Sequence, residues 1–339
     1  DLTGEARVRE QDRGNPLAAS STLNRLELGT PDTAASDRYK RITADGEALD
    51  RLLVDVFLDA QRKPPREIWL DLDATDDPLH GHQEGRFFHG YYRCYCYLPL
   101  YIFCGEHLLC ARLRPADRDA STGSIEELQR IVDQVRARWP KTRIIIRGDS
   151  GFCREPIMAW CEANAVRYVL GLARNKRLQR ALGAEMAAAR QAHERTGKAA
   201  RRFRDFRYRT RKSWSCERRV VGKAEYLPGK ANPRFVVTDL KPREACAKRL
   251  YEKLYCARGE MENRIKEQQL GLFADRTSSA TLRANQLRLY FSSFAYVLLH
   301  GLRRLGLSGT AFAKAQSTTI RLKLLKIGAR LRLTARKVW

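Results

Sequence analysis

Residues Arg143–Asp149 read RIIIRGD, three consecutive isoleucines followed by an arginine, a glycine and an aspartate. A short continuous apolar run of this kind is typical of a strand that is buried on both faces of a sheet. Helical periodicity predicts a helix over 123–139 before the run and another over 155–164 after it, and 166–172 predicts a further strand. The alternation of strands and helices predicts an α/β fold, with a mixed central sheet flanked by helices on both faces.

A second strand is predicted upstream, at Glu67–Asp73, which reads EIWLDLD. Its apolar residues alternate with Trp69, Asp71 and Asp73, and this period of two places both aspartates on one strand face. In open α/β sheets, functional groups gather beyond the carboxyl ends of the strands. Acids at the ends of two strands, Asp73 and Asp149, therefore predict a site at that edge.

A third acid lies on the stretch Tyr255–Gln269, YCARGEMENRIKEQQ, which predicts one amphipathic helix. Its apolar stripe consists of Leu254, Ala257, Met261 and Ile265. The polar stripe beside it consists of Tyr255, Arg258, Glu262, Lys266 and Gln269. Taken alone, this stripe has two interpretations: a solvated face with i,i+4 ion pairs, or a helix that presents Glu262 to the two aspartates.

The chain is strongly basic, with 64 Lys and Arg against 39 Asp and Glu, a net charge of +25 and a pI of about 10.0. Such an excess points to a polyanion as partner, and the alternative is a generically basic protein. No run approaches the roughly 18 uninterrupted apolar residues of a membrane span, and no secretory signal opens the sequence. Nine cysteines in a long chain indicate reduced thiols and a cytoplasmic protein.

The charge is concentrated in residues 174–240, which we interpret as a basic, β-rich insertion. Within it, 206–211 alternates apolar residues with Arg207, Arg209 and Arg211. These arginines either follow a DNA backbone or form a solvated strand face. Trp214 has two interpretations as well, stacking on a displaced base or ordinary packing.

Three carboxylates thus stand out by their placement: Asp73, Asp149 and Glu262. Hard divalent cations such as Mg²⁺ take carboxylate oxygens and keep several waters, so two or three acids suffice as ligands. Two such ions activate an attacking oxygen and stabilise the leaving oxygen of a phosphodiester, while surrounding Arg and Lys bind the phosphates.

Three blocks carry a family resemblance: LDLDAT at 70–75, IIIRGDSGF at 144–152, and Y-x2-R-x3-E at 255–262. In this order, with a basic β-rich segment before the third, they resemble the DDE transposases of bacterial insertion sequences. The resemblance implies a ribonuclease-H-like core. It also implies that Asp73, Asp149 and Glu262 are the catalytic, metal-binding carboxylates.

Further roles follow from the resemblance residue by residue. Tyr255 and Arg258 match the tyrosine and arginine that contact the DNA end in the family. The signature's lysine falls on Gln269, which is a departure, and Lys266 is the substitute. Asp71 shares the strand face of Asp73 and competes with it, but the Asp-x-Thr setting favours Asp73.

The implied activity is cut-and-paste transposition: metal-dependent cleavage at transposon ends, then strand transfer of the freed 3′-hydroxyl into target DNA. The implied cofactor is Mg²⁺, two ions per active site, with Mn²⁺ as a substitute. The implied partners are double-stranded DNA and a second copy in a homodimeric synaptic complex, with no membrane, in the bacterial cytoplasm at the nucleoid. Two alternatives stay open: a truncated, inactive DNA-binding protein, and a plain two-metal DNA nuclease.

Other clusters have competing interpretations. His80 and His82 either ligate a transition metal or belong to a polar loop at the rim of the cleft. Zinc is one interpretation of Cys94, Cys96, Cys104 and Cys110, but the spacing lacks C-x2-C knuckles, which favours half-buried strand cysteines.

The predicted organisation has five parts. Residues 1–60 form an N-terminal arm and helix, interpreted as a truncated DNA-binding region, and 306–339 form a basic tail. The core comprises 61–173 and 241–305, on either side of the insertion at 174–240. The remaining expected elements are a helix over 44–61, two or three antiparallel strands within 87–114, strands over 218–221 and 234–238, helices over 243–269 and 283–304, and edge strands over 320–323 and 330–333.

Overall fold

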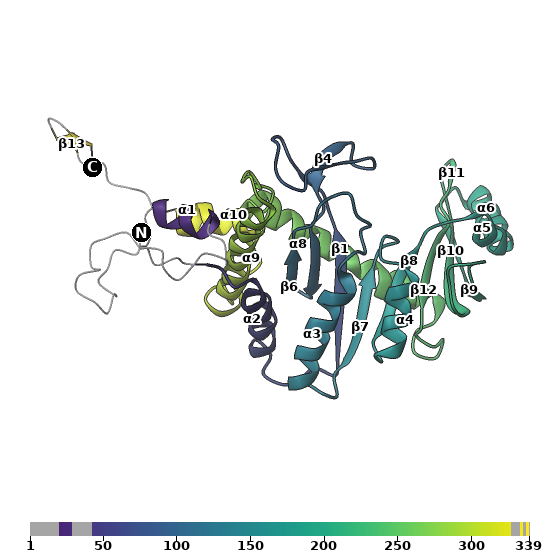
Figure 1. Cartoon of the computed structure of the whole chain (residues 1–339). Coiled ribbons are helices and arrows are strands. Elements are labelled where there is room, and N and C mark those ends of the chain that lie inside the picture. Colours follow the sequence, from purple (N-terminus) through teal and green to yellow (C-terminus); the bar gives the residue numbers. More distant parts are fainter. Residues whose placement is uncertain (1–19, 29–42, 327–332, 335–336, 339) are drawn as a thin grey trace.

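The computed structural model describes residues 20–28, 43–326, 333–334 and 337–338 (Figure 1). Most of the predicted N-terminal arm, and the expected strand over 330–333 except for Leu333, lie outside the described residues. The main sheet has nine strands in the order β11-β10-β12-β8-β7-β1-β5-β6, with β9 paired to β10. These strands are β1 (Glu67–Ala74), β5 (Leu100–Cys104), β6 (His107–Arg112), β7 (Arg143–Gly148), β8 (Arg167–Leu172), β9 (Ala200–Tyr208), β10 (Arg218–Leu227), β11 (Lys230–Ala231) and β12 (Arg234–Thr238).

The described helices match most of the periodic segments of the sequence. They are α1 (Ser20–Leu28), α2 (Gly46–Asp59), α3 (Ser124–Arg138), α4 (Glu155–Ala163), α5 (Lys176–Ala181), α6 (Gly183–Thr196), α7 (Ala247–Arg249), α8 (Gly259–Lys266), α9 (Leu282–Leu305) and α10 (Ser317–Ile320). Within the described ranges, no helix is long and apolar enough to cross a lipid bilayer.

Strand β1 lies in the middle of the sheet. It pairs antiparallel with β5 on one side and parallel with β7 on the other, and β7 pairs parallel with β8. All three isoleucines of RIIIRGD are at most 1% exposed, because β7 is covered on both faces as the apolar run predicted. The expected mixed central sheet with flanking helices is confirmed.

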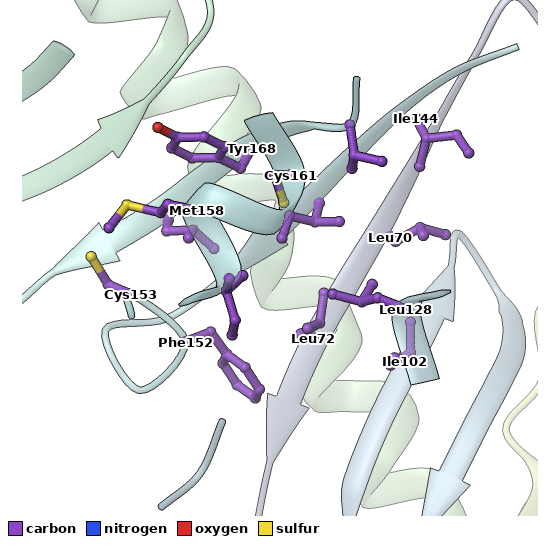
Figure 2. Close-up of a cluster of buried hydrophobic side chains, with 14 of the residues drawn as sticks. Leu70, Leu72, Ile102, Leu128, Ile144, Phe152, Cys153, Met158, Cys161 and Tyr168 are labelled. Carbon is purple, nitrogen blue, oxygen red and sulfur yellow. The ribbon is translucent and has the colours of Figure 1, made fainter. Parts of the chain in front are cut away.

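The alternation of β1 assigns its two faces. Leu70 and Leu72 point into a large apolar core with α2, α3 and α4, where Figure 2 shows them beside Leu128 and Phe152. The opposite face of the sheet packs against α8 and α9. Because Asp71 and Asp73 alternate with the leucines, they lie on the α8 side.

The basic segment continues the main sheet. Strand β12 pairs antiparallel with β8, β10 pairs with β12, and β9 pairs with β10. Figure 1 shows α5 and α6 beside this end of the sheet. These two helices were not expected from the sequence, in which the Arg-rich and Ala-rich run 176–196 shows no clear apolar stripe.

Two local expectations differ from the structure. Residues 87–114 contain four strands, of which β3 (Phe87–His89) and β4 (Cys94–Tyr97) leave the main sheet and form a separate sheet with β2 (Asp77–Pro78), in the order β2-β4-β3. The edge strand expected over Ile320–Lys323 is wrong, because these residues are helical. A four-residue alternation also fits one turn of helix, and burial of Ile320 decides for the helix.

Candidate active site

The two aspartates come together because β1 and β7 run parallel. Leu72 of β1 pairs in register with Gly148 of β7, so the next residues, Asp73 and Asp149, follow side by side at the carboxyl ends. Asp73 is still within β1, whereas Asp149 begins the loop that leads to α4. This edge of the sheet is where the sequence predicted the site.

Backbone contacts fix the Asp149 loop. The Oδ1 of Asp149 accepts a hydrogen bond of 2.8 Å from the backbone N–H of Gly151. On the neighbouring strand, a Cβ at Gly171 would lie 2.5 Å from the Oη of Tyr255 and 3.2 Å from the carbonyl carbon of Asp149. Glycine at this position therefore lets the Tyr255 side chain pack against the Asp149 loop.

The helical segment that carries Glu262 is irregular. Residues Leu250–Tyr255 form a π-helical turn, Cys256–Arg258 a 3₁₀ turn, and α8 is followed by a second π-helical turn at Glu267–Gly271. Such turns within a helix occur frequently at functional sites. The predicted single helix over 243–269 is therefore a chain of short helical pieces that begins at Ala247.

The predicted stripes of α8 are nevertheless confirmed. Met261 and Ile265 are 0% and 3% exposed and anchor the helix on the core. This anchoring turns Arg258, Glu262 and Lys266 towards the strand ends, where all three line one cavity.

Arg258 lies between two of the carboxylates. Its Nη1 is 3.4 Å from the Oδ1 of Asp73, and its Nη2 is 3.2 Å from the Oε1 of Glu262. The Arg258 side chain is only 16% exposed, so this contact is shielded from solvent far more than an ordinary i,i+4 pair. Arg258 thus forms the expected i,i+4 ion pair with Glu262 and at the same time contacts Asp73.

Electrostatics set Asp73 apart from ordinary surface acids. Burial, together with the nearby carboxylates of Asp149 and Glu262 and against the opposing charge of Arg258, raises the pKa of Asp73 to about 6. Burial also raises the pKa of Tyr255 above its usual range. A raised carboxyl pKa beside other acids in a cavity is typical of a functional site.

The cavity has a volume of about 660 Å³ and contains all three predicted carboxylates. Its other lining residues include Arg154, Arg258, Lys266, Gln269, and the aromatic side chains of Tyr91 and Tyr92. The Nε2 of Gln269 donates to the backbone oxygen of Asp76 over 3.1 Å. Gln269 thus supports the wall of the cavity, while Lys266 supplies a positive charge one turn from Glu262.

These residues fit a hard divalent cation in chemistry. The donors are carboxylate oxygens alone, as Mg²⁺ prefers, and a guanidinium cation already stands between Asp73 and Glu262. Among the described residues, no group of three or more His, Cys, Asp or Glu side chains is arranged so that it could hold a metal ion. The carboxylates share one cavity without being drawn into contact with one another.

Asp71 has a structural position. Its two carboxylate oxygens accept hydrogen bonds of 2.5 and 2.7 Å from Arg147, and both side chains are buried. Arg147 also donates to the backbone oxygen of Leu254 over 2.6 Å. Because Asp71 is fully engaged away from the cavity, the geometry supports Asp73, and not Asp71, as the functional aspartate of β1.

The residues predicted to bind DNA in the basic segment lie apart from the carboxylates, and none of them lines the cavity. Arg207 is exposed and donates to the backbone oxygen of Glu217, and Arg209 donates to that of Trp214. Arg211 is exposed beyond the end of β9, which stops at Tyr208 and does not continue through residue 211.

The stacking interpretation of Trp214 is wrong for this structure. Its side chain is only 5% exposed and packs edge-on against Tyr208, with the ring centroids 5.7 Å apart. The guanidinium of Arg218 lies over its ring. Trp214 therefore belongs to the core, in line with the packing interpretation.

The other metal candidates are not supported. His82 is exposed and hydrogen-bonded to Arg86 over 3.1 Å, and neither His80 nor His82 lines the cavity. All nine cysteines are free thiols. Cys96, Cys104 and Cys110 are buried in strands, as the packing interpretation held.

Sequence reasoning missed the aromatic side of the cavity. Tyr91 and Tyr92 lie in the turn between β3 and β4, and His89 ends β3 beside them. The high frequency of aromatic residues in this part of the sequence predicted strands, but it did not predict that some of these side chains line the cavity. Arg154 was also missed, because it lies in a loop with no local motif.

Known proteins are similar to this chain in sequence and in structure. A family model described as "Transposase DDE domain group 1" matches residues 4–339. A piggyBac transposase synaptic complex with hairpin DNA is similar in structure, with 12% identity and a TM-score of 0.40 over 69% of this chain. The match spans 46% of that chain, less than half of its length.

A Ciona intestinalis endonuclease V bound to a 23mer DNA is similar too, with 9% identity and a TM-score of 0.27, covering 75% of this chain and 97% of that one. The comparison with curated proteins found no match. Transposases with a DDE domain act on DNA and generally use divalent metal ions. Since the family match covers nearly the entire sequence, this chain belongs to the family of DDE-domain transposases, group 1.

Proposed function

We propose that this chain is a DNA transposase that cleaves DNA at the ends of its own element and joins the freed 3′ ends to target DNA. Asp73, Asp149 and Glu262 are the proposed catalytic carboxylates. The observation that carries the proposal is their meeting in one cavity, from two adjacent parallel strand ends and a facing helix.

The same three carboxylates are the proposed ligands of two Mg²⁺ ions, with Mn²⁺ as a substitute. Bound ions would supply Lewis-acid polarisation of the phosphodiester and neutralise the charge that develops on its oxygens. Oxygen-only donors support a hard cation, and the closeness of Arg258 to Asp73 and Glu262 supports a demand for positive charge at that point.

The protein's own side chains have distinct proposed tasks. Arg258 and Lys266 hold the phosphates of the bound strand at the cavity, and Tyr255 orders the Asp149 loop from its position against Gly171. Arg207, Arg209 and Arg211 lie farther along the sheet, where they contact the flanking duplex. These assignments are supported by exposure and charge, since phosphate contacts position a duplex without reading its sequence.

The proposed partners are double-stranded DNA and a second copy of the chain in a homodimeric synaptic complex. We propose a cut-and-paste pathway, and an origin in a bacterial insertion sequence acting at the nucleoid, on the strength of the sequence blocks at 70–75, 144–152 and 255–262. The net charge of +25 supports the DNA partner.

Strand transfer with matched variants of α8 tests this function. Glu262→Gln and Glu260→Gln each remove one carboxylate, and each carboxylate pairs with an arginine one turn away at 3.2 Å. The substrate is labelled DNA carrying the ends of the element that encodes the chain, with Mg²⁺ or Mn²⁺. We expect Glu262→Gln to lose cleavage and joining, and Glu260→Gln, whose side chain faces solvent, to retain both.

The outcomes separate the alternatives. Cleavage without any joined product would identify a plain two-metal nuclease. DNA binding with neither reaction, at any divalent cation, would identify a DNA-binding remnant. Equal activity of Glu262→Gln and wild type would show that the cavity is not the active site.

A further inference from the structure

Exposed aromatic side chains are concentrated on one small part of this molecule. Among the described residues, four of the six large aromatic side chains that face solvent belong to the β3–β4 hairpin. They are Phe87 (51% exposed), Phe88 (48%), Tyr91 (85%) and Tyr95 (44%). Burying such side chains is worth about 1.5–3 kcal/mol each, so a concentration left in solvent indicates a surface that another molecule covers.

The hairpin lies at the mouth of the carboxylate cavity. Tyr91 and Tyr92 line that cavity together with Asp73 and Asp149. The Oη of Tyr92 donates over 3.4 Å to the backbone oxygen of Ala74, the residue after Asp73. Figure 1 shows β4 projecting from the main sheet, so the hairpin offers its outer side to solvent.

The rings of the hairpin meet edge to face and do not stack on one another. Tyr91 meets Tyr92 at an interplanar angle of 86°, with the centroids 5.1 Å apart, and at 85% exposure its ring stays largely in solvent. Phe88 and Tyr95 form a directly opposed cross-strand pair, also edge-on at 5.4 Å. A flat, solvent-exposed face next to another ring suits a flat aromatic ligand.

Cations lie close to these rings, beside the carboxylates of the cavity. The guanidinium of Arg86 lies 3.7 Å from the Tyr95 ring centroid, and Arg93 is exposed in the turn before β4. Across the cavity mouth lie Arg154 and Lys266. Aromatic faces interleaved with Arg and Lys form the chemistry that binds single-stranded nucleic acid, in which rings stack on bases and cations hold phosphates.

We propose that the β3–β4 hairpin is a stacking site for unpaired DNA bases, with Tyr91 receiving the base next to the phosphodiester held in the cavity and the Phe88–Tyr95 pair receiving a base farther along that strand. The proposal rests on the function proposed above, and it assigns to this hairpin the base contact that the burial of Trp214 removes from the basic segment. A paired base inside a duplex keeps its faces stacked on its neighbours, so this site selects a strand that has been opened.

Binding assays without divalent cation test the proposal apart from catalysis. The probes are a fluorescent oligothymidylate and a fully paired duplex, titrated with wild type, Tyr91→Ala, Tyr91→Phe and Phe88→Ala. Phe291→Ala is the matched control, because Phe291 is 51% exposed on α9 and does not line the cavity. Tyr91 is 85% exposed, so its replacement removes no core packing.

We expect Tyr91→Ala to weaken oligothymidylate binding by about 5- to 150-fold, the range for losing one base–aromatic stack. Duplex affinity should stay unchanged, and Tyr91→Phe and Phe291→Ala should bind both probes like wild type. The dependence of affinity on salt should also be unchanged, because no phosphate contact is removed.

Three results would overturn the proposal. They are no oligothymidylate binding by wild type, equal losses of affinity for oligothymidylate and for the duplex, and an unchanged oligothymidylate affinity in both Tyr91→Ala and Phe88→Ala. Failure of the proposed function would instead appear as unchanged strand transfer in Glu262→Gln. The two failures are therefore distinguishable.

Discussion

Replacing Asp71 should lower the stability of the protein and leave the catalytic chemistry intact. Replacing Asp73 should abolish that chemistry and change the stability little. The two residues are two positions apart on one strand face, and only their partners differ. Asp71 is 2% exposed and receives two hydrogen bonds from Arg147, which is itself buried. Asp73 contacts Arg258 at a single, longer distance of 3.4 Å.

The magnitude follows from the buried pair. Asp71→Asn keeps the shape of the side chain but leaves the guanidinium of Arg147 buried without its counter-charge. Removing one partner of a buried pair costs about 3–5 kcal/mol. Because Arg147 also donates to the backbone oxygen of Leu254, the loss should extend to the π-helical turn before Tyr255. For Asp73→Asn we expect a smaller loss than for Asp71→Asn, because its contact with Arg258 is single and longer, and because the pKa of the buried carboxyl group is already raised to about 6.

Urea unfolding followed by tryptophan fluorescence measures this difference, since the Trp69 ring lies 5.1 Å from the Arg147 guanidinium and reports on the pair. A double-mutant cycle supplies the control. Asp71→Leu with Arg147→Met replaces both charges by apolar groups, so the double variant should be more stable than the sum of the single losses predicts.

The structural assignment of Asp71 has a clear counter-outcome. If Asp71→Asn unfolds at the same urea concentration as wild type and yet abolishes strand transfer, then Asp71 is the functional aspartate and the assignment of Asp73 is refuted. If the stability loss of the double variant equals the sum of the two single losses, the Asp71–Arg147 pair has no coupling energy, and the magnitude given above for Asp71→Asn is refuted.

Three further predictions concern stability. Burial by itself would raise the pKa of Glu225. Hydrogen bonds, of which the one from Lys223 contributes most, outweigh burial and lower this pKa to about 2. Because this folded-state pKa is depressed, the stabilisation is present above the unfolded value of about 4.5 and is lost as pH falls towards 2. In thermal melts, Glu225→Gln should be less stable than wild type at pH 7, and the gap should close below pH 4.5; parallel curves would contradict this. Gly171→Ala should lower the melting temperature and displace Tyr255, because its Cβ would lie 2.5 Å from the tyrosine Oη. Gly259→Ala, on an open helical face, should raise the melting temperature by the equivalent of about 0.5–1 kcal/mol.

The parts of the site that the sequence predicts are those with a local signal. Three patterns can be recognised from neighbouring residues alone. They are the apolar run that ends at Asp149, the strand of period two that ends at Asp73, and the helical stripe of period 3.6 that carries Glu262. Their meeting in one cavity required the parallel register of β1 and β7, which follows from the general rule on strand ends.

The parts that could not be predicted depend on partners distant in sequence. Trp214 sits in an exposed-looking, basic stretch, and its burial depends on Tyr208 and on Arg218, which is itself held by Glu155 and Glu162. The aromatic run after Phe87 has strand propensity whichever sheet it joins. The pairing of β4 with β2 places the β3–β4 hairpin in a separate sheet, and Tyr91 in this hairpin lines the cavity.

The basic segment and the carboxylate cavity are coupled through one strand. Gly171 of β8 pairs with Val236 of β12, and its neighbour Leu170 pairs with Gly148 at the end of β7. The same glycine supplies the space in which Tyr255 packs against the Asp149 loop. The strands of the basic segment therefore hold the end of β8 in the position that Tyr255 requires. The proposed contact between DNA and this extension would therefore bear on the same strand that supports the Asp149 loop.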